Sequence, residues 1–103
     1  MSGAELIAAA VDAVDFGRPT AARRGRNPAY PWVPIIDHGP QATGVHTTRT
    51  VQIPARAFAT RDEAVAYAAD HIDRVRGALA ADLANPRYRA LRRAHGLPEA
   101  VAS

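Results

Sequence analysis

FATRDEAVAYAADHIDRVRGALAADLA, residues 58–84, is the stretch of sequence that decides the fold. Its TRDE segment at 60–63 is a capping box, in which Thr60 caps a helix and Glu63 reaches back to it. An NP pair at 85–86 ends the helical pattern. Between these limits apolar residues recur at helical spacing on one side: Val65, Ala68, Ala69, Ile72, Val75, Leu79 and Leu83. The sequence therefore predicts one long amphipathic helix.

Two segments upstream of this helix are predicted as strands. Residues 32–37 are rich in β-forming side chains, but Pro31 and Pro34 flank and interrupt them, so we expect an edge strand. Residues 45–58 alternate between apolar and polar side chains as far as Pro54, where the alternation changes face and indicates a bulge or bend. Together the segments predict a hairpin, or a three-stranded sheet if the longer segment divides into two strands.

The remaining segments complete the predicted architecture. Residues 1–16 contain an alanine-rich helix, residues 17–31 read as an extended arm of arginine, proline and glycine, and residues 86–95 read as a short last helix. We expect an α+β fold in a single domain, with its core over residues 32–98. In that core the long helix packs on a small antiparallel sheet.

Composition limits the classes of function. The chain has 103 residues and no cysteine, which excludes disulfides, thiolate zinc sites and cysteine nucleophiles. All 13 basic residues are arginine and the formal net charge is +3, a mild bias towards anionic partners. A GC-rich genome also produces abundant arginine and alanine without lysine. Because no targeting signal or membrane span is visible, we expect a cytoplasmic protein that contacts no membrane.

Signals for catalysis and metal binding are sparse. The only serines are Ser2 and Ser103, so a serine triad is not available, and no glycine-rich phosphate loop is present. Asp37, His38 and His46 flank one loop and could approach one another across a hairpin, but no fourth metal ligand is placed. We therefore expect a protein that is not an enzyme and that holds no metal and no cofactor.

Arginine clusters are the candidates for contact with nucleic acid, because the planar guanidinium group matches phosphate and basic arms track a phosphate backbone. The clusters lie in the arm, in the hairpin and in the last helix. The candidate residues are Arg23, Arg24, Arg26, Arg49, Arg56, Arg89, Arg92 and Arg93. The alternative interpretation is that they are solvated charges, scattered by codon bias over any surface.

Aromatic and apolar residues offer a second kind of contact. Trp32, Tyr88 and Leu91 are candidate partner-binding residues, since tryptophan and tyrosine are enriched at binding hot spots. Trp32 has the alternative role of a core residue between sheet and helix. The N-terminal helix and the long helix also present more apolar surface than one small sheet covers, which would suit the pairing of two copies.

Two resemblances rest on short motifs. FATRDEA at 58–64, after the predicted hairpin, resembles the N-terminal arm-binding domain of phage tyrosine integrases over residues 30–75. That resemblance implies a three-stranded sheet that enters the major groove of DNA, a supporting helix, and Arg49 and Arg56 facing the groove. Pro34 and Pro54 depart from the regular strands of that family.

The second resemblance covers most of the chain. YPWVP at 30–34, NPRYRAL at 85–91 and HGLP at 95–98 are similar to small uncharacterised proteins of actinobacteria and their phages. The resemblance implies an accessory protein of a phage or mobile element. The sequence thus predicts a non-enzymatic protein that binds a protein partner or self-associates. The alternative is a small DNA-binding protein that uses the arginine arm and the hairpin, with affinity that falls steeply with salt.

Overall fold

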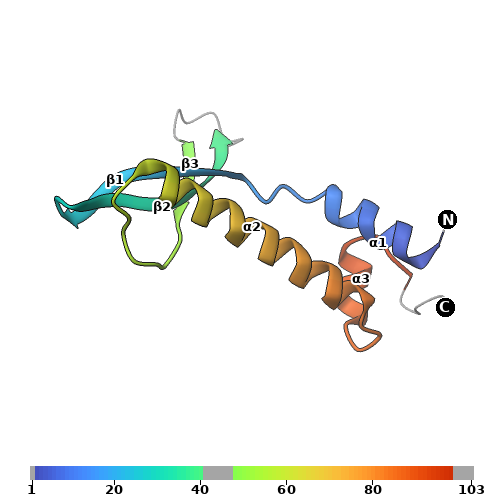
Figure 1. Cartoon of the computed structure of the whole chain (residues 1–103). Coiled ribbons are helices and arrows are strands. Elements are labelled where there is room, and N and C mark those ends of the chain that lie inside the picture. The colour runs from blue at the N-terminus through green and yellow to red at the C-terminus, as the bar shows by residue number, and fades with distance from the viewer. Residues whose placement is uncertain (1, 41–47, 99–103) are drawn as a thin grey trace. The chain divides into compact units, whose positions relative to one another are not determined.

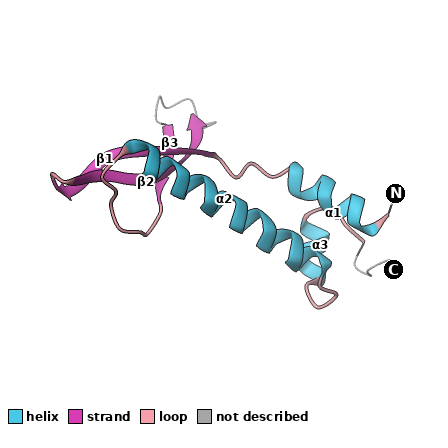
Figure 2. Cartoon of the chain, in the orientation of Figure 1, coloured by secondary structure: helices cyan, strands magenta, loops and turns pink. Residues whose placement is uncertain are grey.

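The computed structural model describes residues 2–40 and 48–98, with the backbone alone at 40, 48 and 49. It confirms the predicted α+β fold of helix, three-stranded antiparallel sheet, long helix and short C-terminal helix. The elements, coloured along the chain in Figure 1 and by type in Figure 2, are α1 (Gly3–Asp12), β1 (Arg18–Asn27), β2 (Tyr30–Pro40), β3 (Thr48–Gln52), α2 (Arg61–Ala84) and α3 (Arg89–Ala94).

The chain contains two compact units; the single domain expected over residues 1–103 stays a prediction. The sheet unit is Phe16–Asp73, and the helical unit is Met1–Asp15 together with Arg74–Ser103. The helix α2 begins in the sheet unit and ends in the helical unit. Each unit buries apolar side chains of its own.

Strand β1 occupies the segment that was predicted as an extended arm over residues 17–31, so that prediction is wrong. β1 pairs antiparallel with β2 and forms one edge of the sheet, in the order β1-β2-β3. Its sequence, RPTAARRGRN, lacks the alternation of apolar and polar residues that predicts a strand. An edge strand can be held by its backbone ladder, and its small residues Ala21 and Ala22 lie opposite the buried Pro34 and Val33.

Strand β2 is the central strand, so the prediction of an edge strand over residues 32–37 is also wrong. Both faces of β2 are buried: Val33 and Ile35 lie on one face, Pro34 and Ile36 on the other. The carbonyl of Pro34 accepts a hydrogen bond from the N–H of Ile53 at 3.1 Å. The proline is tolerated because β3 has already ended at Gln52, so its missing N–H costs one bond at the end of the ladder.

A bulge in β1 accommodates Pro31, the first proline of β2. Arg23 lies opposite Trp32 and Asn27 lies opposite Tyr30, so three residues of β1 face the single Pro31. Gly25 stands in this bulge, and a side chain there would collide with the Tyr30 carbonyl oxygen and the Pro31 backbone. Close approach of the two backbones therefore requires glycine.

The predicted bend near Pro54 is present. β3 ends at Gln52, the chain leaves the ladder, and Phe58 then forms an isolated antiparallel bridge with Trp32. The N–H of Phe58 donates to the Trp32 carbonyl at 2.7 Å, and the N–H of Trp32 donates to the Phe58 carbonyl at 3.1 Å. These two bonds fix the chain just before α2 begins.

The capping box begins α2 where the sequence predicts it. The N–H of Glu63 donates to the Thr60 hydroxyl oxygen at 3.2 Å, and that hydroxyl donates to the Glu63 carboxylate at 2.9 Å. The first half of the helix packs on the sheet through small side chains, since Ala64 and Ala68 are fully buried. The core cluster of the sheet unit joins Ile36, Ile53, Ala68 and Ile72, with Phe16 and Tyr67 packed against it.

The helical unit contains α1, the second half of α2, and α3. Ser2 caps α1 by accepting the N–H of Glu5 at 3.2 Å, as the sequence predicts. Asp12 near the end of α1 forms an exposed ion pair of 3.3 Å with Arg76 of α2. The buried apolar side chains of this unit are Val11, Leu83 and Leu97.

The short helix α3 begins at Arg89, three residues later than the predicted start at 86. The side chain of Asn85 accepts the N–H of Arg87 at 3.0 Å, and the Asn85 carbonyl accepts the N–H of Tyr88. Asn85 therefore organises a turn between the helices. Gly96, with φ of 73°, follows the last helical turn as predicted.

Arg92 is the one buried charged residue among those the structure describes, with 4% of its surface exposed. Its Nε donates to the Pro98 carbonyl at 2.7 Å, and its Nη1 donates to the Leu83 carbonyl. Leu83 lies in the last turn of α2, where helix carbonyls lack partners within the helix and attract a cation. Arg92 thus ties the end of α2 to the segment after α3.

Candidate nucleic-acid interface

Charge is distributed unevenly along the sheet unit. Residues 16–61, which contain all three strands, hold seven arginines and one acidic residue, Asp37, a formal charge of +6. Residues 62–73, in the first half of α2, hold four acidic residues and no arginine, a formal charge of −4. Codon bias would account for a large number of arginines, but not for the scarcity of acidic residues over residues 16–61.

The arginines of β1 reach solvent. Arg18, Arg23, Arg24 and Arg26 are exposed, and Arg24 and Arg26 flank Gly25 in the bulge. The guanidinium carbon of Arg23 lies 6.0 Å from the centroid of its cross-strand neighbour, the Trp32 ring, within reach of a cation–π contact. These side chains leave a delocalised positive charge open to an anionic ligand.

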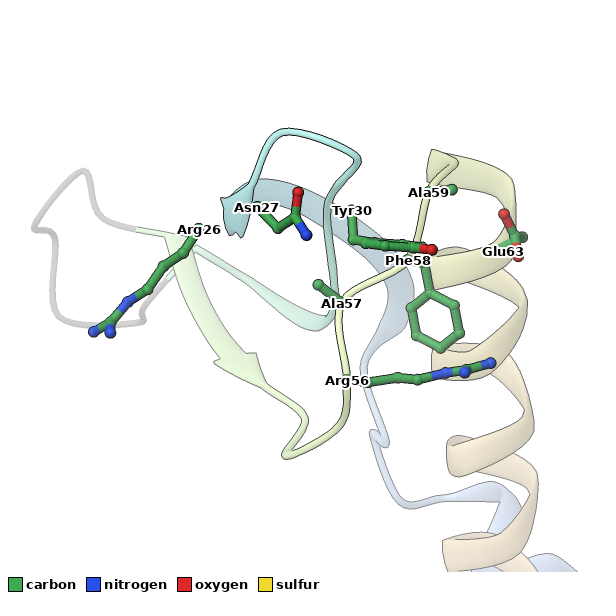
Figure 3. Close-up of a pocket in the computed structure, with 8 residues that line it drawn as sticks. All are labelled: Arg26, Asn27, Tyr30, Arg56, Ala57, Phe58, Ala59 and Glu63. Carbon is green, nitrogen blue, oxygen red and sulfur yellow. The ribbon is translucent and has the colours of Figure 1, made fainter.

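An open pocket of about 490 Å³ lies at the hairpin end of the sheet unit (Figure 3). Three segments build it: the turn between β1 and β2, the segment that returns to the sheet after Pro54, and the first turn of α2. Its lining residues are Arg26, Asn27, Tyr30, Arg56, Ala57, Phe58, Ala59 and Glu63.

Aromatic side chains give this pocket a rigid wall. Phe58 is anchored by its two backbone bonds to Trp32, and its ring lies 5.4 Å from that of Tyr67 at 44°. The guanidinium of Arg56 lies 5.6 Å from the Phe58 ring centroid, and Figure 3 shows the Arg56 side chain passing beside that ring. Tyr30, by contrast, is 51% exposed.

Polar groups stand on two sides of the aromatic wall. Asn27 is oriented by its Oδ1, which accepts the N–H of Ala29 at 2.9 Å, so its amide NH2 group is the end left to a ligand. Glu63 is held by the Thr60 hydroxyl at the start of α2. The pocket therefore combines cations, an aromatic face, an amide and a carboxylate.

The predicted nucleic-acid residues divide between the two units. Arg23, Arg24, Arg26 and Arg56 are exposed in the sheet unit; Arg89 and Arg93 are exposed in the helical unit. Arg49 lies in β3, and its side chain is outside the described residues. The prediction that Arg92 contacts nucleic acid is wrong, because its guanidinium is buried and donates to two carbonyl oxygens.

The predicted partner-binding residues also divide. Trp32 in the sheet unit is half-buried under Arg23, while in the helical unit Leu91 is half-buried and Tyr88 is 47% exposed.

The sequence analysis considered Asp37, His38 and His46 as a possible group of metal ligands. Of these, His46 lies outside the described residues. Asp37 accepts the N–H of Gly39 at 2.8 Å within β2, at the point where the pairing of β2 with β3 shifts register. Over residues 2–40 and 48–98 no cluster of three potential metal ligands occurs.

Sequence reasoning missed Asn27, Tyr30 and Glu63 as members of one pocket. The NPAY segment at 27–30 was the available signal, because Asn-Pro favours a turn and Tyr30 begins a run of β-forming residues. A hairpin centred on Pro28 would have brought Arg26 and Tyr30 together. Glu63 was assigned only its capping role, which it does perform.

None of the helices in the described part of the chain has the length and apolarity needed to cross a membrane. Comparisons with protein-family models, curated proteins and solved structures found no match.

Proposed function

We propose that this protein binds DNA through the sheet unit, as a non-enzymatic accessory protein. The observation that carries the proposal is the separation of charge, +6 over residues 16–61, which contain the three strands, and −4 over residues 62–73 of the following helix. A cationic sheet with its acidic residues gathered on the helix attracts a polyanion without strong repulsion from its own carboxylates. Arginine in particular forms paired hydrogen bonds with phosphate.

The order of elements also supports DNA as the polyanion. The integrase arm-binding domains that residues 58–64 resemble imply a three-stranded sheet followed by a supporting helix. β1, β2, β3 and α2 follow that order, with β1 in the place where an arm was expected. A role in a phage or mobile element rests on the sequence resemblances alone.

The test is the affinity of the protein for a fluorescently labelled DNA duplex, measured by anisotropy at low and moderate salt. The wild-type protein binds at low salt and weakens steeply as salt rises. Replacing Arg23, Arg24 and Arg26 with glutamine lowers the affinity and reduces the slope of log affinity against log salt by roughly 2–3, if each arginine contacts one phosphate. The loss is the same for any DNA sequence.

The matched control is R87Q/R89Q/R93Q, which removes the same net charge from the helical unit. This variant retains most of the affinity if the sheet unit is the interface. Thermal unfolding followed by circular dichroism shows whether both triple variants remain folded. A wild-type protein that does not bind at low salt contradicts the proposal, and loss of affinity in the control alone moves the interface to α3.

Self-association through the helical unit is the second candidate function. The specific observation is that Val75 and Tyr88 of this unit are 42% and 47% exposed. An argument against self-association is that Val11 of α1 is buried and that Leu6, Ile7 and Val14 are half-buried. Part of the apolar surface of α1 is therefore already covered within the chain. Sedimentation velocity tests the idea: wild-type protein dimerises with increasing concentration and V75S/Y88S does not. A wild-type monomer at every concentration removes this candidate.

A further inference from the structure

The half-exposed ring of Tyr30 stands out in the sheet unit. It is the more exposed of the two exposed aromatic residues among those described, the other being Tyr88. Tyr30 follows the Pro28–Ala29 turn and pairs with Asn27 across it, so its backbone is fixed while much of its side chain is open. An ordered ring with an open surface is a platform on which another flat group can stack.

Cations reach the same pocket from two separate segments. Arg26 comes from the bulged end of β1 and Arg56 from the segment before α2, and both are exposed. In Figure 3 Arg26 points away from Tyr30, whereas Arg56 runs past the Phe58 ring, so the two cations lie on different sides of Tyr30. A nucleotide strand has a phosphate on each side of every base, so two separated cations suit a strand whose base occupies the middle.

The polar groups of the pocket suit the edge of a base. The Glu63 carboxylate accepts hydrogen bonds only, and the Asn27 amide NH2 donates them. Every base carries both donors and acceptors on its pairing edge, and these are free when the base is unpaired. In a duplex that edge is hydrogen-bonded to the opposite base, so a paired base cannot bond to Asn27 and Glu63.

We propose that this pocket holds one unpaired nucleobase, stacked on Tyr30, with flanking phosphates on Arg26 and Arg56. The inference rests on the proposed DNA binding and deepens it, since it makes single-stranded or locally opened DNA the preferred ligand. Stacking on an aromatic residue tolerates any base, so the preference is for the unpaired state and not for a sequence.

The experiment compares three labelled ligands by anisotropy: an oligothymidine strand, the same strand with abasic positions, and a blunt duplex. The wild-type protein binds the oligothymidine most tightly. Abasic positions and Y30A each weaken strand binding by about 5- to 150-fold, the range for loss of one stacked base. Y30A weakens strand binding more than duplex binding, because a paired base does not enter the pocket, and Y30F retains strand binding because it keeps the ring.

The matched control is Y88A, which removes a tyrosine of similar exposure from the helical unit. It leaves binding of all three ligands unchanged. Thermal unfolding followed by circular dichroism shows whether Y30A and Y88A remain folded.

Three results overturn the base pocket. One is duplex binding as tight as strand binding; a second is equal loss, or no loss, for Y30A on both ligands. The third is displacement of the strand by a glutamate-rich peptide as effective as unlabelled strand, which shows ion pairing alone. In each case salt-dependent DNA binding by the wild-type protein stands. If the wild-type protein binds neither strand nor duplex at low salt, the proposed function fails and the base pocket fails with it.

Discussion

Two stretches of this chain look alike in sequence and differ in structure. Residues 18–26 and 87–93 each hold four arginines and no acidic residue. In β1 all four are exposed along an edge strand. Around α3 three are exposed, and Arg92 is buried with its guanidinium on the carbonyls of Leu83 and Pro98.

The difference shows what turns an arginine into a structural residue. A guanidinium has five N–H donors, and it can be buried where carbonyl oxygens without other partners meet it. The last turn of α2 supplies such an oxygen at Leu83. In β1 the arginine side chains are exposed, and Arg23 contacts the Trp32 ring and not an oxygen acceptor, so their charge remains available to a ligand. The density of arginine in a sequence therefore does not identify a nucleic-acid surface; the supply of protein acceptors decides.

The largest effect on stability is expected for removal of Arg92, the buried arginine of the second stretch. Arg92→Ala leaves the carbonyls of Leu83 and Pro98 without their donor and opens a cavity, so we expect a loss of about 2–4 kcal/mol in the free energy of unfolding. Urea unfolding followed by circular dichroism measures it. Arg92→Lys keeps the charge but not the forked donors, so its free energy of unfolding lies between those of the wild-type protein and Arg92→Ala.

Arg89→Ala is the matched control for this comparison. Arg89 is exposed on the same helix, so its removal changes the free energy of unfolding by less than about 0.5 kcal/mol. If Arg92→Ala were as mild as Arg89→Ala, Arg92 would not hold the end of α2, and the contrast between the two stretches would disappear.

The helices were predictable because their signals are local. Ser2, Thr60 and Gly96 act at the helix ends where the sequence places them. A cap involves residues three or four apart, so no distant part of the chain is needed to recognise it. The same locality made the bend near Pro54 visible.

The sheet was predicted only in part, because strand pairing is not local. β1 was mistaken for an arm, since glycine, proline and arginine are what linkers also contain. Pro34 argued for an edge strand, and only the end of β3 at Gln52 explains why it is central. Once β1 is placed beside β2, the pocket around Tyr30 follows, which is why the arginines were predicted individually but the pocket was not.

A smaller effect tests whether the first stretch depends on its bulge. Gly25→Ala places a methyl group against the Tyr30 carbonyl and the Pro31 backbone, neither of which can move without breaking the pairing of β1 with β2. We expect a loss of about 1–3 kcal/mol in the free energy of unfolding, the usual cost of overpacking. Because Arg24 and Arg26 flank this glycine, the variant also binds DNA more weakly under conditions in which it is still folded.

Gly77→Ala is the control, since it adds the same methyl group to the interior of α2, where nothing lies within 4 Å. Alanine is the better helix former, so this variant gains up to about 1 kcal/mol and binds DNA as the wild-type protein does. Opposite signs for the two substitutions in one denaturation series would show that β1 is held by close backbone approach. A Gly25→Ala variant as stable as wild-type protein would mean that β1 can separate from β2 at little cost. Its arginines would then belong to an extended arm, as the sequence analysis predicted for residues 17–31.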